Sequence, residues 1–256
     1  MAEVTHACPP DGQFLTPCCG MTPFELPRTG RMTLDPSLVT CAAPLWSILI
    51  PTLSSRQAKF LDLMSVLLPQ AEANGRVEVV ALHNDGERSI ADYRQALLED
   101  ARGAYVSYVD DDDMIEPDFV AVVTAAMKGW PDFIAFWHAY YVDGHRDPRP
   151  VVTGIGRDWH DTATEMIRGT THINPVRSVI AKQADFRVKI GDGLEDWSYV
   201  SAVTPLLRTQ AEIPRVLYHY RHSPADSVQH RLAPHAFAPR PVITSPCFRW
   251  HEWSTG

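Results

Sequence analysis

Apolar and polar positions alternate with two different periods along the first half of the chain. Three apolar runs have the length and β-branched content of buried strands: Trp46–Pro51, Val77–Leu82 and Ala104–Val109. Between them, residues 56–74 and 90–101 place apolar side chains at helical spacing, and Gly75 and Gly103 follow these two patterns. Alternating strands and helices predict an α/β fold with a doubly wound, mostly parallel sheet, which binds ligands at the carboxyl ends of its strands.

The second half of the chain shows a coarser pattern. We expect a helix over 118–128 and a strand over 132–138, followed by a proline- and glycine-rich loop or short hairpin that runs to Trp159. The remaining elements predicted are helices around 162–168 and 197–209 and a strand around 215–220.

The two ends of the chain differ from its middle. Residues 1–44 are rich in Pro, Gly, Thr and Cys and lack apolar periodicity, so hydrophobic burial alone cannot order them. The end of the chain contains many prolines and is expected to form a tail on the surface. We therefore predict three parts: a cysteine-rich segment over 1–44, an α/β domain over 45–230 and a proline-rich tail over 231–256.

Composition and charge narrow the classes of partner. Lys and Arg total 23 against 31 for Asp and Glu, and the net charge of −8 argues against a broad electrostatic grip on nucleic acid or anionic membrane. No stretch approaches the roughly 20 apolar residues that span a bilayer, and the first residues lack the charged-then-apolar order of a secretion signal. We expect a cytoplasmic protein without a membrane partner.

Four of the five cysteines lie within the first 41 residues. In a reducing compartment such a cluster indicates a metal site before a disulfide, and tetrahedral Zn²⁺ would supply the folding free energy that this segment lacks. The candidate zinc ligands, of which three or four are expected to bind, are His6, Cys8, Cys18, Cys19 and Cys41. Their spacing matches no C-x-x-C pair, and the alternative is a set of buried or incidental thiols.

Four consecutive aspartates, Asp110–Asp113, follow the third predicted strand. They are expected at the edge of the sheet where α/β folds bind substrate. Like charges at this density repel one another unless a cation neutralises them, and oxygen ligands suit Mg²⁺ or Mn²⁺. The alternative is a solvated acidic loop that caps the next helix.

The segment from Trp46 to Ser227 resembles the family 2 inverting glycosyltransferases, which have the nucleotide-diphospho-sugar transferase (GT-A) fold. The resemblance rests on elements that recur in order and at family-like spacing: Ser47–Thr52 (SILIPT), Asn84–Gly86 (NDG), Arg94 and Ala101–Asp113 (ARGAYVSYVDDDD). It implies transfer of a sugar from a nucleotide diphosphate sugar to an acceptor hydroxyl, with Mn²⁺ or Mg²⁺ as cofactor.

The resemblance also implies a donor site. Asp110 and Asp112 match the family's D-x-D motif, which binds the metal and the donor diphosphate, and Asp111 or Asp113 could substitute in that role. Three further positions are implied to contact the donor: Asp85 the nucleoside base, Thr52 the nucleotide at the end of the first strand, and Arg94 the donor pocket.

Gly191–Trp197 (GDGLEDW) resembles the family's glycine-rich approach to an acidic pair. Asp196 matches the catalytic base, which takes the proton from the acceptor hydroxyl as it attacks the anomeric carbon opposite the leaving diphosphate. Glu195 is expected to orient the acceptor or to exchange roles with it. These acids also suit the start of a helix, and both interpretations hold together.

Tyr218–Ser223 (YHYRHS) resembles the family's segment after the catalytic domain, where a histidine reaches the metal or the diphosphate. His222 fits that position better than His219, although a histidine in an aromatic strand is also typical of a hydrogen-bonded core. Arg221 is a candidate for pairing with phosphate oxygens. His172 lies where acceptor loops tend to be, but no motif supports it.

The acceptor remains open at this stage. The cysteine segment resembles short modules of actinobacterial virus proteins, which implies a bacteriophage protein in the host cytoplasm and an acceptor that is a protein, a glycan or a modified nucleic acid base. The competing functions are a nucleotidyltransferase and an inactive transferase-like module that binds a glycan or a partner. Residues 51–59 lack the glycine-rich basic loop typical of the former, and a binding module needs neither the aspartate run nor Asp196.

Overall fold

A computed structural model describes residues 43–84, 88–188, 195–223, 243 and 245–251. All of them belong to one compact unit, Ala42–Gly256. No helix among these described residues is long and apolar enough to cross a membrane.

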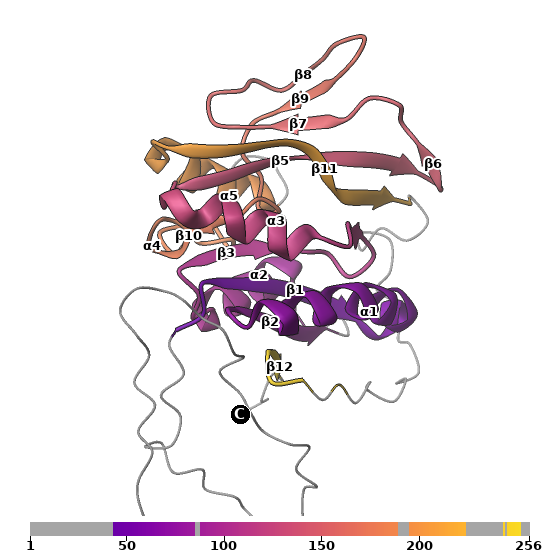
Figure 1. The fold of residues 1–256 in the computed structure, drawn as a ribbon, viewed down its shortest axis with the longest axis vertical. Coiled ribbons are helices and arrows are strands. Elements are labelled where there is room, and N and C mark those ends of the chain that lie inside the picture. Colours follow the sequence, from indigo (N-terminus) through magenta and orange to yellow (C-terminus); the bar gives the residue numbers. More distant parts are fainter. Residues whose placement is uncertain (1–42, 85–87, 189–194, 224–242, 244, 252–256) are drawn as a thin grey trace, which may run out of the picture. The chain divides into compact units, whose positions relative to one another are not determined.

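A mixed sheet forms the centre of this unit (Figure 1). Its first half consists of parallel strands in the order β12 (Phe248–His251), β2 (Val77–Asn84), β1 (Trp46–Leu53) and β3 (Tyr105–Tyr108). The short antiparallel strand β10 (Val176–Arg177) then connects β3 to β5 (Phe133–Val142). The long pairings of the sheet are parallel, which confirms the α/β fold with a mostly parallel sheet.

The second half of the sheet is built around β5. The long strand β11 (Gln210–His222) runs parallel to β5, and its carboxyl-terminal part also pairs with β4 (Met114–Ile115). Short strands extend the sheet beyond β5: β6 (His145–Arg146), β7 (Val151–Thr153), β9 (Met166–Arg168) and β8 (His160–Asp161). We call residues 151–168 the β7–β9 extension, which lies at the opposite end of the sheet from β12 (Figure 1).

Helices cover both faces of the sheet. α1 (Gln57–Asn74) and α3 (Phe119–Ala126) bury apolar side chains in one core, whereas α2 (Ile90–Asp100), α4 (Ser178–Ala181) and α5 (Glu195–Val203) line the other. Strand residues alternate between the two cores, with Ile48 and Ile50 in the first and Leu49 in the second, as the two-residue period of a strand requires. Three 3₁₀ turns complete the described elements: Ser54–Arg56, Met127–Gly129 and Thr204–Leu206.

Local sequence signals explain several of these boundaries. Gly75 ends α1 in the left-handed conformation, with φ 68°, which glycine adopts without strain. Ser89 and Asp92 form a reciprocal capping box that starts α2. At Gly103 a Cβ atom would lie 2.5 Å from the backbone nitrogen of Ser47, so only glycine permits β1 to pass the turn before β3.

Two elements differ from the sequence-based expectation. The helix predicted around 162–168 is wrong, because this segment follows β8 directly and forms a turn and then β9. The hydroxyl of Thr162 accepts hydrogen bonds from the backbone N–H groups of Thr164 and Glu165, and this local turn competes with a helix. In addition, Phe248–His251 of the expected tail form an edge strand of the sheet, where Trp250 packs against Phe60.

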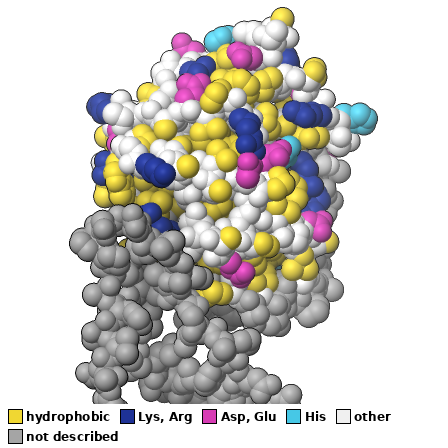
Figure 2. Space-filling view, viewed as in Figure 1, with side chains coloured by type: hydrophobic (Ala, Val, Ile, Leu, Met, Phe, Trp, Pro, Cys, Tyr) yellow, Lys and Arg dark blue, Asp and Glu magenta, His cyan; other side chains and the backbone are white. Residues whose placement is uncertain are grey.

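The charged side chains on the face shown in Figure 2 are interspersed in sign. Lys and Arg alternate there with Asp and Glu, and the described part of this face shows no broad basic patch.

Candidate active site

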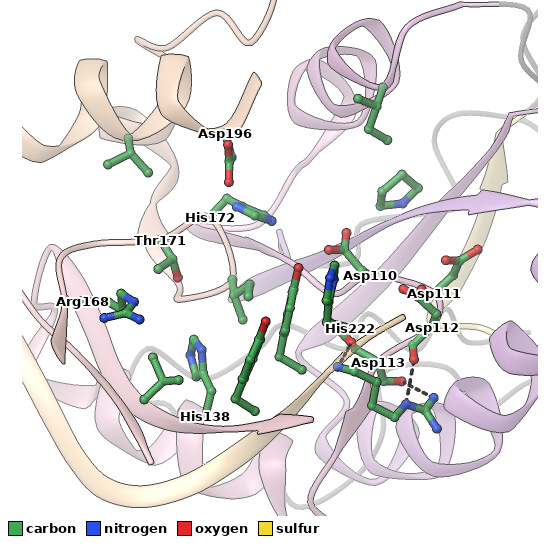
Figure 3. A pocket seen from close by; sticks show the side chains of 18 of the residues that line it. Asp110, Asp111, Asp112, Asp113, His138, Arg168, Thr171, His172, Asp196 and His222 are labelled. Carbon is green, nitrogen blue, oxygen red and sulfur yellow. Dashed lines mark hydrogen bonds between the residues drawn. The ribbon is translucent and has the colours of Figure 1, made fainter. Parts of the chain in front are cut away.

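A cavity of about 710 Å³ lies at the carboxyl ends of β1 and β3. Its wall combines the Asp110–Asp113 run with the first turn of α5, the loop before β10, the end of β11 and the β7–β9 extension (Figure 3). The volume is in the range typical of small-molecule sites, and the position is where doubly wound sheets bind their ligands.

The four aspartates divide into two pairs. Asp111 and Asp113 are each only 1% exposed and are held by groups of the chain itself. The side chains of Asp110 and Asp112 remain 21% and 14% exposed. The alternation leaves the carboxylates of Asp110 and Asp112 as the more accessible of the four, at the spacing of a D-x-D motif.

Asp111 ties the run to the end of β1. Its carboxylate accepts hydrogen bonds from the backbone N–H of Leu53 at 3.0 Å and from Arg56 at 3.0 Å. Arg56 also pairs with Asp112 at 3.1 Å. Burial raises the pKa of Asp111 to about 6, because it outweighs the favourable charge of Arg56. Burial likewise raises the pKa of Asp112, which Arg56 offsets only in part.

Asp113 ties the run to β11. Its two oxygens accept hydrogen bonds from the Tyr218 hydroxyl and from the backbone N–H of Arg221, both at 2.6 Å. Burial, together with the charge of Asp110, raises the pKa of Asp113 well above its usual range. Because both oxygens accept hydrogen bonds within the protein, Asp113 anchors the run, and its role as a metal ligand stays a prediction.

Arg94 joins the two acidic sides of the cavity. One terminal nitrogen pairs with Asp110 at 2.9 Å and the other with Glu195 at 3.1 Å. Burial works against the charged form of Asp110, yet the charge of Arg94 together with those of His172 and Arg56 outweighs it and lowers the pKa of Asp110. The sequence placed Arg94 near the donor pocket, and the structure shows it buried between Asp110 and α5.

Asp196 and Glu195 form the first turn of α5 and line the cavity. Asp196 accepts a hydrogen bond from the backbone N–H of Trp197 at 2.9 Å. In Figure 3 its carboxylate points toward the interior of the cavity, across from the aspartate run. The structure therefore brings together the two acidic groups that the sequence separates by more than 80 residues.

The end of β11 contributes the candidates His222 and Arg221, which both line the cavity. Arg221 donates from Nε to the backbone oxygen of Asp112 at 2.7 Å, so it braces the aspartate loop. His219 instead lies 2.8 Å from Glu116 and 3.4 Å from the Tyr141 hydroxyl, and it is outside the cavity wall. Of the two histidines, His222 is the one with access to a bound ligand.

Thr52 is buried at the end of β1 and lines the cavity as expected. Other candidates lie outside the described residues: Asp85, His6, Cys8, Cys18, Cys19 and Cys41. Within the described part of the chain, no group of three or more His, Cys, Asp or Glu side chains is arranged to hold a metal ion. Asp110 and Asp112 nevertheless provide the oxygen donors that Mn²⁺ or Mg²⁺ prefers, and both line the cavity.

Sequence reasoning missed Arg56 and His138, and it found no motif for His172. Arg56 and His138 lie in segments where a basic or aromatic residue is unremarkable, so only their positions in the fold bring them to the cavity. Burial lowers the pKa of His172 to about 4 and that of His138 to about 3, and the charge of Arg94 adds to the effect at His172. Both imidazoles are therefore neutral at physiological pH.

Comparison with known proteins places this geometry in context. No family model matches the chain. The uncharacterized protein y4gI of Sinorhizobium fredii is 24% identical over 181 residues, which are 67% of this chain but 19% of the relative.

Solved structures of Staphylococcus aureus TarS share the fold. TarS 1–349 in complex with UDP-GlcNAc superposes with a TM-score of 0.54 at 15% identity, covering 73% of this chain and 61% of that one. The complex of TarS 1–349 with UDP gives a TM-score of 0.52 at 17% identity, covering 71% and 61%. The chain thus spans less than two thirds of these proteins, and at this identity the likeness shows the fold.

Proposed function

We propose that this chain is a metal-dependent, inverting glycosyltransferase that moves a sugar from a nucleotide diphosphate sugar to an acceptor hydroxyl. The observation that carries the proposal is one cavity lined by both the D-x-D aspartates and the acidic first turn of α5. The shared fold with TarS, of which one structure holds UDP-GlcNAc, supports a nucleotide sugar as donor. The proposed assignment to glycosyltransferase family 2 rests on the sequence motifs.

The donor diphosphate belongs on the aspartate side of the cavity. Asp110 and Asp112 would hold Mn²⁺ or Mg²⁺ together with His222, and the bound cation would offset negative charge on the departing diphosphate. Arg221 and Thr52 complete this side, while Asp111 and Asp113 hold the loop in place through Leu53 and Tyr218. Asp85 remains the proposed contact of the nucleoside base.

The acceptor belongs on the α5 side. Asp196 would take the proton of the acceptor hydroxyl as that oxygen forms its bond to the anomeric carbon and the bond to the diphosphate oxygen breaks. Glu195 pairs with Arg94, which also pairs with Asp110, so this arginine holds the first turn of α5 close to the aspartate run. Attack opposite the leaving group gives inversion without a covalent enzyme intermediate.

A nucleotide panel tests the proposal. The full chain is titrated with the diphosphates of uridine, guanosine, cytidine and thymidine and with their sugar conjugates, each with and without Mn²⁺, by thermal shift and calorimetry. Stabilisation that requires both one nucleotide and the cation supports the donor site, because a ligand that binds only the folded state raises its stability. Folded protein that binds no donor would contradict it, and release of pyrophosphate from a triphosphate would indicate a nucleotidyltransferase.

Asp112→Ala gives the matching variant prediction. It should reduce Mn²⁺-dependent turnover by at least about 100-fold, because it removes an oxygen ligand of the proposed cation while the loop stays anchored through Asp111 and Asp113. The melting temperature without metal should change little. Asp62→Ala, at an exposed position of α1, is the control and should retain activity. Turnover of Asp112→Ala at the unmodified rate would rule out this ligand.

The N-terminal segment carries a separate proposal based on the sequence alone. Residues 1–44 bind structural Zn²⁺ through ligands drawn from His6 and the four cysteines of this segment. Zinc analysis of the purified full chain tests it, and one equivalent that survives dialysis is expected. The proposed cytoplasmic location and viral source rest on the sequence in the same way.

A further inference from the structure

Two histidines in the cavity wall have buried nitrogens without a partner. His172, in the loop before β10, is 7% exposed, and His138, on β5, is 4% exposed. In each, the Nε2 atom is inaccessible to solvent and lacks a hydrogen-bond partner. A buried polar nitrogen left in this state costs free energy, so native structures rarely retain one without a reason.

Both rings line the cavity, on its left half in Figure 3. His172 projects between Asp196 and the aspartate run, and His138 lies farther along the same wall, near Thr171 and Arg168. His172 is held by an edge-to-face contact with Tyr108, and His138 by contacts with Phe136 and Tyr218. These contacts fix both rings in the wall of the cavity that also contains the proposed diphosphate site and the proposed base.

The charges around this wall are balanced. Arg168 pairs with Asp161 at 2.8 Å and also donates to the backbone oxygen of Ile167 at 2.7 Å. Arg149 pairs with Asp147 at 3.0 Å and with Asp161 at 3.3 Å. A charged ligand group in this half would meet arginines and aspartates that already pair with one another, whereas an uncharged hydroxyl could satisfy a ring nitrogen that has no partner.

We propose that His138 and His172 form the subsite for the transferred sugar, that they hydrogen-bond its hydroxyl or acetamido groups, and that this sugar is uncharged. The inference rests on the proposed function, because it assumes the diphosphate near Asp110 and Asp112. A neutral imidazole donates from one ring nitrogen and accepts at the other, which suits a hydroxyl group that can do both. The subsite selects a hexose or N-acetylhexosamine over a uronic acid.

The experiment separates the sugar from the nucleotide. Calorimetry with Mn²⁺ compares UDP with UDP-glucose, UDP-GlcNAc and UDP-glucuronate, or the same set on another base if the nucleotide panel selects one. The full-length wild-type protein should bind at least one neutral conjugate more tightly than the diphosphate alone. His172→Ala should lose about 10-fold in affinity for that conjugate, which corresponds to one hydrogen bond, and retain the affinity for the diphosphate.

Two further variants make the test specific. His172→Gln keeps a side chain that donates and accepts hydrogen bonds and should recover part of the loss, whereas a purely structural role of the ring would not give such a selective rescue. His145→Ala, on the exposed strand β6, is the control and should bind every ligand as the wild type does. His138→Ala should weaken binding of the same conjugate as His172→Ala does and leave the affinity for the diphosphate unchanged.

The outcomes distinguish this inference from the proposed function. If neither the diphosphate nor any conjugate binds, the proposed function fails and the inference fails with it. If the diphosphate binds with Mn²⁺ but all conjugates bind equally well, or if His172→Ala weakens both classes alike, the donor site stands and the sugar subsite is wrong. Tighter binding of UDP-glucuronate than of the neutral conjugates would refute an uncharged sugar.

Discussion

Four identical aspartates acquire different roles through their neighbours. The backbone N–H of Leu53 and the Tyr218 hydroxyl each bind one of the buried carboxylates, Asp111 and Asp113. Asp110 and Asp112 keep access to the cavity. Two of the four aspartates therefore anchor the loop, and the other two are candidate ligands of the cation.

Asp196→Asn should separate binding from chemistry. The amide retains the size of the side chain but cannot accept the acceptor's proton, so transfer should fall by at least about 100-fold while calorimetry shows unchanged donor affinity. Anomeric NMR of the wild-type product should show inversion. Transfer by Asp196→Asn at the unmodified rate would show that another group is the base.

The buried histidines should make stability depend on pH in a defined window. The folded-state pKa of His138 is lowered to about 3, whereas the unfolded chain titrates near the ordinary value of 6.5. Between these values the unfolded state binds more protons, so the free energy of unfolding falls as the pH drops below 6.5. The contribution is fully present above the unfolded-state pKa.

Replacement of the ring gives the measurement. His138→Phe removes this titration, and the slope of unfolding free energy against pH from 4.5 to 6 should decrease by up to about 1.4 kcal/mol per pH unit. Urea unfolding at several pH values provides the slope. His145→Phe, on exposed β6, is the matched control, and an unchanged slope in His138→Phe would contradict the buried neutral state.

At the scale of elements, the turn before β3 sets the position of the aspartate run. Gly103 donates its backbone N–H to the Ser47 hydroxyl at 2.7 Å, and the Ser47 hydroxyl in turn donates to Glu78 at 2.5 Å. The close approach of this turn to β1 fixes where β3 begins, and Asp110 reaches the cavity two residues after Tyr108, the last residue of β3 that pairs with β1.

Gly103→Ala adds only one methyl group but should clearly lower the free energy of unfolding. The added Cβ would lie 2.5 Å from the Ser47 backbone nitrogen, which must shift, and overpacking of this kind costs about 1–3 kcal/mol of unfolding free energy. Gly129→Ala is the control, because the nearest atom to its Cβ is 4.0 Å away. Equal stability of the two variants in urea unfolding would show that the turn relaxes freely.

At the scale of the whole molecule, Glu78 connects distant segments of the chain. Its buried carboxylate pairs with Arg102 at 2.9 Å and with Arg249 of β12 at 3.0 Å. Burial disfavours its charged form, but the hydrogen bond from Ser47 and the neighbouring arginines outweigh this and lower the pKa of Glu78. Strand β12 is thereby attached to the same folded body as the candidate active site.

Glu78→Gln should weaken the attachment of β12 to the rest of the sheet. Loss of the charge leaves two arginines without their shared partner and should lower the free energy of unfolding by about 1–3 kcal/mol. Glu72→Gln, on the exposed side of α1, should stay within about 0.5 kcal/mol of the wild type. Chemical denaturation measures both, and an unaltered stability of Glu78→Gln would place the attachment of β12 elsewhere.

The sequence predicted the elements whose signals are local and long. The helices and strands predicted between Trp46 and His138 follow their apolar periods, and Gly75 ends a helix as predicted, because chain geometry makes these periods independent of the rest of the protein; the short strand β4 was not predicted. The segment around 162–168 was mispredicted as helix, because a threonine-based turn and pairing with β7 decide its structure. The strand β12 depends on a neighbour, β2, that lies far away in sequence.

The candidate site divides in the same way. The amino-acid sequence by itself determined which residues are acidic, that Asp110–Asp113 follow a strand, and that Asp196 lies near the start of a helix. Only the tertiary structure decided which aspartates are anchored, which of His219 and His222 reaches the cavity, and that His138 and His172 line it with unpartnered nitrogens. The physical reason is that periodicity is set by neighbours along the chain, whereas hydrogen-bond satisfaction and burial are set by groups that only folding brings together.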